Sequence, residues 1–206
     1  MGDKRLGRPT DLSKDIAILK AARELLFGQG PDAVTMEGVA VRARVSKGTM
    51  YARYANRQQL LQSIVESESK RITVSIGMPP EILQDLKSGL LEFVEQLTAF
   101  LVSNEHLKLM EVLALPTTEM RKLKKQIYQN GPQKTLDALA EYLESAAKTG
   151  LIRCQSPVNS AELLLGMMMG LDLVRASYGI PMRIKQKKEN KDHAQSIVSA
   201  FLTLHQ

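Results

Sequence analysis

The chain has 206 residues, of which 44% are apolar, 24% are charged and only 4% are aromatic, with no tryptophan. This length allows one substantial domain or two small ones, and the apolar content excludes disorder of the whole chain. Leucine, alanine and methionine are frequent, and their high helix propensity favours an all-α fold. The formal net charge of +6 and the pI near 9.4 suggest a polyanionic partner, although a basic surface also confers solubility.

The sequence carries no recognisable signal for export or for a membrane span. The single cysteine, Cys154, excludes an intramolecular disulfide, and no basic segment followed by an apolar one opens the chain. The longest apolar tract, residues 161–174, contains Glu162 and Asp172 and is too short to cross a bilayer. We therefore expect a cytoplasmic protein with no membrane partner.

Two helices are predicted in the first forty or so residues. The first begins near Ser13 and stops at "GQGPD", and its apolar face consists of Ile18, Ala21, Ala22, Leu25 and Leu26. The second begins after Thr35, a favoured N-cap residue, and lasts only about two turns. Its periodic apolar positions are Met36, Val39, Ala40 and Ala43.

A third and a fourth helix follow at once. Ser46 is the next candidate N-cap, and the third helix runs to about Tyr54. Asn56 and Gln59 resemble a capping box at the start of the fourth helix. The apolar face of this fourth helix consists of Leu60, Leu61, Ile64, Ile72 and Ile76.

The sequence "GMPPE" at 77–81 is the sharpest break in the chain, and one of its prolines is expected in the first turn of the next helix. We place a domain boundary there. The predicted organisation is a flexible arm at 1–12, an N-terminal domain at 13–76 and a C-terminal domain at 77–206.

The C-terminal domain is predicted to be helical as well. Its expected helices cover 82–101, 105–115, 118–129, about 132–149, 156–178 and a last segment after a basic loop at 183–191. Alternation typical of strands is absent from the sequence. The fold class is therefore all-α, with about nine to ten helices.

The short third helix is unusual because it is basic and carries little apolar surface. If Met50 points inward, the opposite face carries Gly48 and Ala52, flanked by Thr49 and Tyr51, with Lys47 in the first turn. Small residues there allow close approach to a surface, and the polar groups around them can donate to phosphates or base edges. A short helix, a tight turn and this second helix form a helix-turn-helix, whose second helix enters the major groove.

A plainer interpretation is that this basic helix is only a solvated face. Against it, residues 42–57 contain no acid, and their cations are Arg42, Arg44, Lys47, Arg53 and Arg57. These charges lie near two helix N-termini, which offer free backbone N–H groups to phosphates.

The segment "TMEGVAVRARVSKGTMYARYANRQQLLQSIV" from Thr35 to Val65 resembles the DNA-binding domain of the TetR (tetracycline repressor) family, and "ILKAARELLFGQG" resembles its first helix. The resemblance covers about the first third of the chain. It implies a bacterial one-component regulator: a homodimer that binds a palindromic operator, with a divergent C-terminal domain that binds a small molecule.

The resemblance assigns DNA contacts to residues of the helix-turn-helix. Thr35 and Arg57 are expected at phosphates, and Tyr51 at the edge of the groove, while Tyr54 fills the position of a packing aromatic. The complete predicted DNA-binding set is Thr35, Arg44, Ser46, Lys47, Gly48, Thr49, Tyr51, Arg53 and Arg57.

Two departures from the family pattern concern the same segment. Arg44 stands where the turn usually has glycine, so the turn either avoids a left-handed backbone or is strained there. Ala52 and Arg53 replace an aromatic residue and a histidine that are common in relatives. The arm at 1–12 could enter a minor groove or remain a disordered tail.

The predicted helix at 156–178 is apolar around most of its circumference and therefore needs cover on several sides. Gly166 and Gly170 either allow close packing of another helix or accommodate bulky neighbours within the chain. The TetR resemblance implies that this helix builds a four-helix dimer interface with the helix at 132–149 or with the last one.

An apolar or amphipathic effector is expected in the C-terminal domain, since methionine side chains suit irregular ligands, although ordinary core filling explains them equally well. The candidate lining residues are Leu90, Phe93, Leu97, Phe100, Met110, Tyr128, Met167, Met168 and Asp172.

Catalysis has no support in the sequence. The three histidines are far apart, Cys154 has no histidine nearby, and phosphate-loop and dinucleotide motifs are absent, so we expect no enzyme, no metal and no cofactor. A ligand-responsive repressor is the leading hypothesis. The alternatives are a DNA-binding protein of the same fold without a small ligand, and a helical lipid-carrier or interaction protein.

Overall fold

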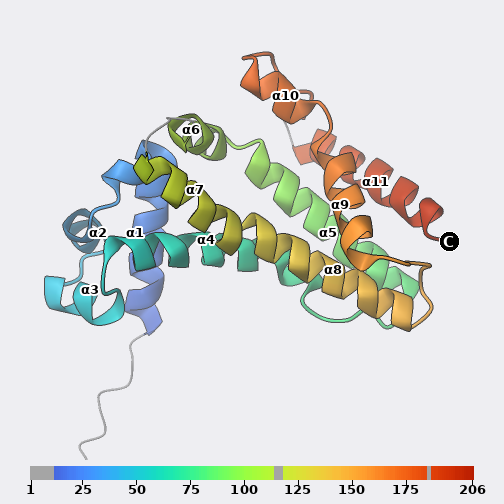
Figure 1. Ribbon diagram of the computed structural model, residues 1–206, viewed down its shortest axis with the longest axis horizontal. Helices are drawn as coiled ribbons and strands as arrows, with labels where there is room; N and C mark the ends of the chain where they lie inside the picture. Colours follow the sequence, from blue (N-terminus) through green and yellow to red (C-terminus); the bar gives the residue numbers. More distant parts are fainter. Residues whose placement is uncertain (1–11, 114–117, 185–186) are drawn as a thin grey trace, which may run out of the picture. The chain divides into compact units, whose positions relative to one another are not determined.

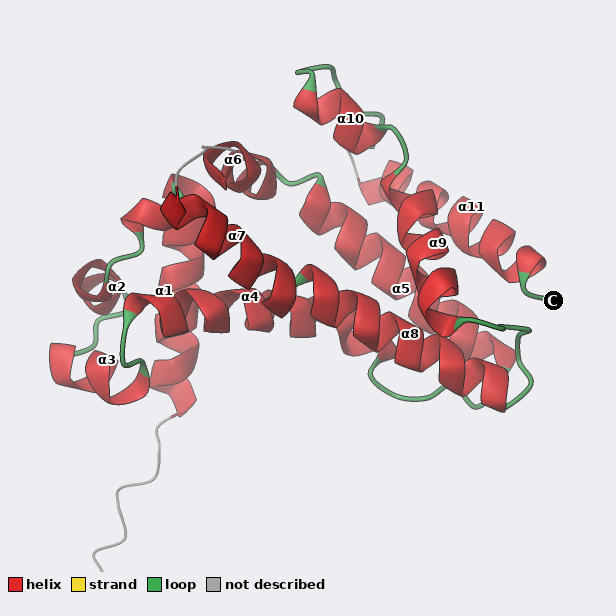
Figure 2. Cartoon of the chain, in the orientation of Figure 1, coloured by secondary structure: helices red, strands yellow, loops and turns green. Residues whose placement is uncertain are grey.

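The computed structural model describes residues 12–113, 118–184 and 187–206 (Figure 1). These residues form helices joined by short connections and contain no strand, as Figure 2 shows, which confirms the predicted all-α class. Packing divides the chain into an N-terminal unit that ends at Ile64 and a C-terminal unit that begins at Val65. The division falls inside one helix, ahead of the predicted boundary at residue 77.

The N-terminal unit is built from short helices around a small core. Its elements are α1 (Leu12–Gln29), a 3-10 helix η1 (Pro31–Ala33), α2 (Met36–Arg42), α3 (Lys47–Arg53) and the first half of α4 (Arg57–Thr73). Its fully buried side chains include Ile18, Leu26, Val39, Met50 and Leu60. Burying each of these stabilises the unit by roughly 1.5–3 kcal/mol relative to leaving it exposed.

Side-chain caps set where three of these helices begin. The Thr35 Oγ1 accepts a hydrogen bond from Gly38 N, and the Ser46 Oγ accepts one from Thr49 N, both at 3.0 Å. Asn56 Oδ1 accepts from the backbone N–H of the residue three positions later at 2.9 Å. Each cap satisfies a donor that a helix N-terminus leaves free, so the three predicted N-caps are confirmed.

The C-terminal unit contains the second half of α4 and a bundle of longer helices. Its further elements are a 3-10 helix η2 (Val74–Ile76), α5 (Leu83–Leu101), α6 (Asn104–Leu113), α7 (Thr118–Asn130), α8 (Pro132–Lys148), α9 (Pro157–Met169), α10 (Asp172–Ser177) and α11 (Lys187–Leu204). Helices α5, α8, α9 and α11 share one core, whose fully buried members include Leu90, Phe93, Leu139, Leu143, Leu164 and Phe201.

The predicted single helix at 156–178 is wrong, because the chain breaks after Met169. Gly170 adopts φ 46° and ψ −145°, a backbone conformation that a residue with a side chain rarely adopts. The six residues of α10 then project from the bundle on their own (Figure 1). Gly170 therefore allows the helix to end there, and it does not provide the close helix packing that its spacing from Gly166 suggested.

Two further boundaries differ from the sequence prediction. Helix α5 begins at Leu83, so neither proline of "GMPPE" occupies its first position. Helix α11 begins at Lys187, so the last five residues of the predicted loop at 183–191 are helical. Within the described residues, no helix has the length and hydropathy needed to cross a membrane.

Candidate nucleic-acid interface

Helix α3 presents one anchored face and one open face. Met50 is completely buried and Tyr54, which follows the helix, is 8% exposed, as the sequence predicted. Lys47, Gly48 and Tyr51 lie on the exposed side. A side chain built onto Gly48 would meet only the Ser46 Oγ, at 3.9 Å, so this part of the backbone is open to close approach by another surface.

The turn before α3 has a left-handed residue that is not glycine. Arg44 has φ 55°, while its N–H donates to Val41 O at 3.1 Å and Val45 N donates to Ala40 O at 3.0 Å. Of the two alternatives that the sequence left open, the turn therefore takes the strained one, at a cost of about 1 kcal/mol or more. Arg44 itself is exposed.

The hydroxyls of Ser46 and Thr49 are joined in a defined order. Ser46 Oγ accepts from Thr49 N at 3.0 Å and donates its proton to Thr49 Oγ1 at 2.9 Å. Because Thr49 accepts in this pair, its own hydroxyl proton remains able to point outward. Ser46 thus acts within the protein as the cap of α3, and Thr49 presents a donor at its surface.

Two predicted DNA-contacting arginines are held by other parts of the N-terminal unit. Arg53 pairs with Asp15 of α1, and their side chains are only 16% and 28% exposed. Arg57 donates from Nε to Val34 O at 2.9 Å and from Nη2 to Pro31 O at 2.6 Å. Each guanidinium therefore anchors the start of α1 or the α1–α2 loop. Their predicted contacts with DNA stay predictions.

The sequence reading missed an acidic side chain beside α3. Glu37, the second residue of α2, accepts a hydrogen bond from Tyr51 Oη at 3.3 Å and lies 3.8 Å from Lys47 Nζ. Both contacts use the same oxygen, Oε1. The negative charge of Glu37 is the main cause that raises the pKa of Tyr51, with smaller contributions from burial and from the hydrogen bond. Glu37 lies outside the acid-free segment 42–57, so the charge pattern of that segment gave no sign of it.

In the described part of the chain, the nine predicted effector-site residues differ in their surroundings. Leu90, Phe93, Leu97 and Met168 are packed inside the core, whereas Met110 and Tyr128 are about half exposed. Phe100 and Met167 lie partly buried at the edge of that core. Asp172 lines a sizeable cleft, and the prediction of this site remains untested.

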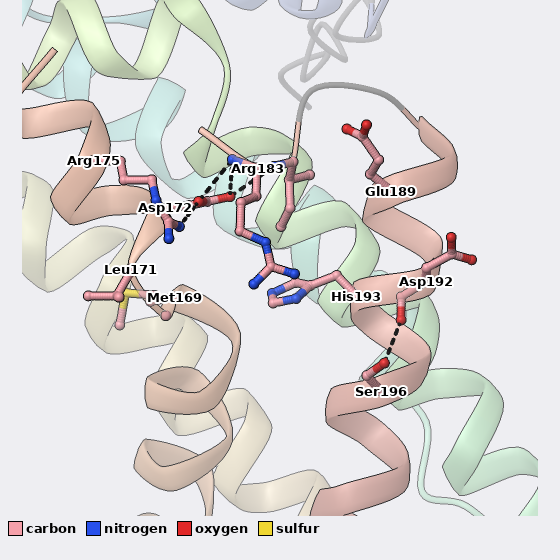
Figure 3. Close-up of a pocket in the computed structure, with 11 residues that line it drawn as sticks. Met169, Leu171, Asp172, Arg175, Arg183, Glu189, Asp192, His193 and Ser196 are labelled. Carbon is pink, nitrogen blue, oxygen red and sulfur yellow. Dashed lines mark hydrogen bonds and ion pairs between the residues drawn. The ribbon is translucent and has the colours of Figure 1, made fainter. Parts of the chain in front are cut away.

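That cleft is open and about 610 Å³ in volume, and it lies between the end of α9, α10 and the start of α11 (Figure 3). Asp172 is 7% exposed and accepts hydrogen bonds from Arg175 Nη1 and from the backbone N–H groups of Arg183 and Ile184, at 2.6–3.1 Å. Burial alone raises the pKa of Asp172, but these three donors outweigh it and lower the pKa overall.

On the other wall of the cleft, the Arg183 side chain extends toward His193 of α11 (Figure 3). His193 Nε2 lies 3.0 Å from the carbonyl oxygen of Met168, so the ring links α11 to the end of α9. Met169 and Leu171 also line the cleft. The cleft thus combines charged and apolar groups, which suits an amphipathic molecule. No cluster of three or more metal-ligating side chains occurs in the described ranges.

A helix-turn-helix with an anchored and an open face is the architecture of a DNA-binding protein. Two family models match this chain: the N-terminal model of the bacterial regulatory proteins of the tetR family covers residues 18–64, and the C-terminal model of AefR-like transcriptional repressors covers residues 88–206. The chain therefore belongs to the TetR family of DNA-binding transcriptional regulators.

Individual relatives agree with this assignment. The uncharacterized HTH-type transcriptional regulator YdeS of Bacillus subtilis is 41% identical over 75 residues, which are 36% of this chain and 37% of YdeS. A crystal structure of a TetR-family regulator from Mesorhizobium loti is 26% identical, with a TM-score of 0.70 and coverage of 96% of this chain and 99% of that one. The flavonoid-responsive regulator FrrA is 22% identical, with a TM-score of 0.64 and coverage of 95% and 98%.

Proposed function

We propose that this protein is a homodimeric repressor that binds a palindromic operator in the cytoplasm and is released by a small amphipathic molecule. One observation carries the DNA-binding part: α3 is fixed by Met50 and Tyr54 while Lys47, Gly48 and Tyr51 stay exposed on its other side. That division of faces is what insertion into a major groove needs.

The predicted DNA-contacting residues fall into groups according to the contacts that each already makes within the protein. Lys47, Thr49 and Arg44 offer donors to phosphates or bases, and Gly48 gives the room for close approach. Thr35 and Ser46 cap helices whose N-termini can receive phosphates. We assign Arg53 and Arg57, which are engaged inside the unit, chiefly to holding α3 and α4 in position.

The proposal of a homodimer rests on exposed apolar side chains of α9. Val158 and Leu163 are 50% and 45% exposed, and Met169 is 39% exposed. A side chain built onto Gly166 would meet nothing within 4 Å, so bulky neighbours in the same chain do not explain this glycine. A second copy, packed against α9 and the adjacent α11, would cover this face. It would also supply the second α3, which reads a half-site about 34 Å away.

Repression and effector binding rest on two other observations. The C-terminal family model describes AefR-like transcriptional repressors. The cleft at Asp172 and Arg183 has the volume of a small-molecule site and groups of mixed polarity. A ligand there could act only by binding more tightly to the protein's DNA-free state than to its DNA-bound state.

Selection from random duplexes tests the DNA-binding proposal without knowledge of the operator. The protein should enrich a palindrome whose half-site centres are about one helical turn, or a multiple of it, apart. No enrichment over random sequence would contradict the proposal and favour the helical carrier or interaction protein.

The selected duplex then allows a test for the effector. Amphipathic molecules are titrated into the complex, beginning with flavonoids, because FrrA has the same fold and is described as responsive to them. Release of DNA by one compound, lost in an Arg183→Ala variant that still binds DNA, is the expected result. Failure of a broad panel to release DNA would favour the alternative of a regulator without a small ligand.

A further inference from the structure

Glu37 is the one acidic side chain that contacts the exposed face of α3 in the described part of the N-terminal unit. Its Oε1 receives the Tyr51 hydroxyl at 3.3 Å and lies 3.8 Å from Lys47 Nζ. Lys47 and Tyr51 are four residues apart, so they occupy the same side of the helix. Neither the family match nor the sequence pattern assigns a role to this carboxylate.

A carboxylate at this place opposes binding to any duplex. Its side chain is 52% exposed, so its charge remains close to the phosphates that Lys47 would approach. Non-specific binding depends almost entirely on neutralising phosphates, so an acid here weakens it. An uncharged residue at position 37 would therefore give tighter non-specific binding to DNA.

The hydrogen bond also fixes how Tyr51 presents itself. A phenol has one proton, and here Tyr51 gives that proton to Glu37, so toward any other partner its oxygen can only accept a hydrogen bond. In the major groove the matching donors are the amino groups of adenine and cytosine, whereas phosphates only accept. The pair therefore favours contact with a base edge over contact with the backbone of DNA.

We propose that Glu37 is a positioning residue for sequence discrimination: it holds Tyr51 as a hydrogen-bond acceptor toward a base amino group and restrains Lys47 from indiscriminate phosphate contact. This inference rests on the proposed function. Its measurable consequence is a higher ratio of operator affinity to non-specific affinity than the same protein would have without the carboxylate.

The test compares wild type, Glu37→Gln and Glu37→Ala on the duplex that wild type selects and on a scrambled duplex, across a range of salt concentrations. Both variants should bind scrambled DNA several-fold more tightly, with a salt slope steeper by up to about 1 as Lys47 gains a phosphate. The operator-to-scrambled ratio should fall three- to ten-fold in Glu37→Ala and less in Glu37→Gln, whose amide oxygen still accepts from Tyr51.

Glu24→Gln is the matched control, because Glu24 is an exposed acid of the same unit that pairs with Arg42 instead of with α3. It should leave the ratio unchanged. In a Tyr51→Phe background, Glu37→Ala should lower the operator-to-scrambled ratio less than it does in the presence of the Tyr51 hydroxyl. An unchanged ratio in Glu37→Ala, or an equal fall with and without the Tyr51 hydroxyl, would overturn the inference. Failure of wild type to select any sequence would instead overturn the proposed function itself.

Discussion

The Nε atom of Arg53 lies 2.5 Å from Oδ1 of Asp15, and this ion pair joins the last turn of α3 to the first turn of α1. Both side chains are largely shielded, so solvent screens the pair less than an ordinary surface ion pair. The angle at which α3 leaves the N-terminal core therefore depends on a residue 38 positions earlier in the chain.

Replacing either partner should weaken folding and DNA binding together. We expect Arg53→Ala and Asp15→Asn each to lower the free energy of unfolding by about 1–2 kcal/mol, because a partly buried charge loses its partner. Urea unfolding and operator affinity measure the two effects. If Arg53 instead acts mainly by touching DNA, Asp15→Asn would leave the affinity equal or improve it.

The left-handed backbone at Arg44 predicts opposite effects on stability and affinity. Arg44→Gly should stabilise the protein by about 0.5–1 kcal/mol, since relief of strain exceeds the extra entropy of an unfolded glycine. The same variant should weaken operator binding and reduce the salt slope by about 1. Arg44→Ala removes the charge but keeps the strain, so it should lose affinity with no gain in stability. Equal free energies of unfolding for Arg44→Gly and Arg44→Ala would contradict the claim that the backbone is strained at Arg44.

His106 should make the C-terminal unit sensitive to mild acid. Burial lowers its pKa below the usual 6.5, and the ring packs on Phe100 with centroids 4.7 Å apart. The unfolded chain takes up a proton more readily than the folded one, so stability is complete above pH 6.5 and is lost as pH falls below it.

Comparison with a non-titrating ring isolates this contribution. His106→Phe keeps the aromatic contact, so its unfolding free energy should decline less than that of wild type between pH 7.5 and pH 5.5. Chemical unfolding at several pH values in this range provides the measurement. Parallel profiles for the two proteins would show that His106 does not titrate differently on unfolding.

The exposed face of α9 predicts a single substitution that separates the protomers. Leu163→Glu places a charge in the proposed dimer interface, so it should yield monomers in sedimentation and weaken operator binding at least ten-fold. Leu83→Glu, at a comparably exposed position of α5, should leave the dimer intact. A dimer that survives Leu163→Glu would move the interface away from α9.

Local sequence was sufficient for features that depend on neighbouring residues. The caps at Thr35, Ser46 and Asn56 follow from residue types favoured at helix starts, and the burial of Met50 and Tyr54 follows from helical periodicity. The all-α class followed from composition and periodicity in the same way.

Contacts between segments far apart in the chain could not be predicted from local sequence. The pairing of Arg53 with Asp15 and the binding of Arg57 to the Pro31 and Val34 carbonyls require the tertiary arrangement of the N-terminal unit. The break at Gly170 was missed because the residues around it favour helix locally, and the clamp on Asp172 from Arg183 and Ile184 lies 11 and 12 positions away.

The most direct test of the central claim is binding of the selected duplex by a Lys47→Ala, Thr49→Ala, Tyr51→Phe triple variant, measured against salt concentration alongside wild type. Met50 and Tyr54 remain, so the fold should persist in circular dichroism. The account predicts that preference for the selected sequence is almost abolished and that the salt slope becomes shallower by about 1. Unchanged preference and slope in a folded triple variant would contradict the assignment of α3 as the DNA-reading helix.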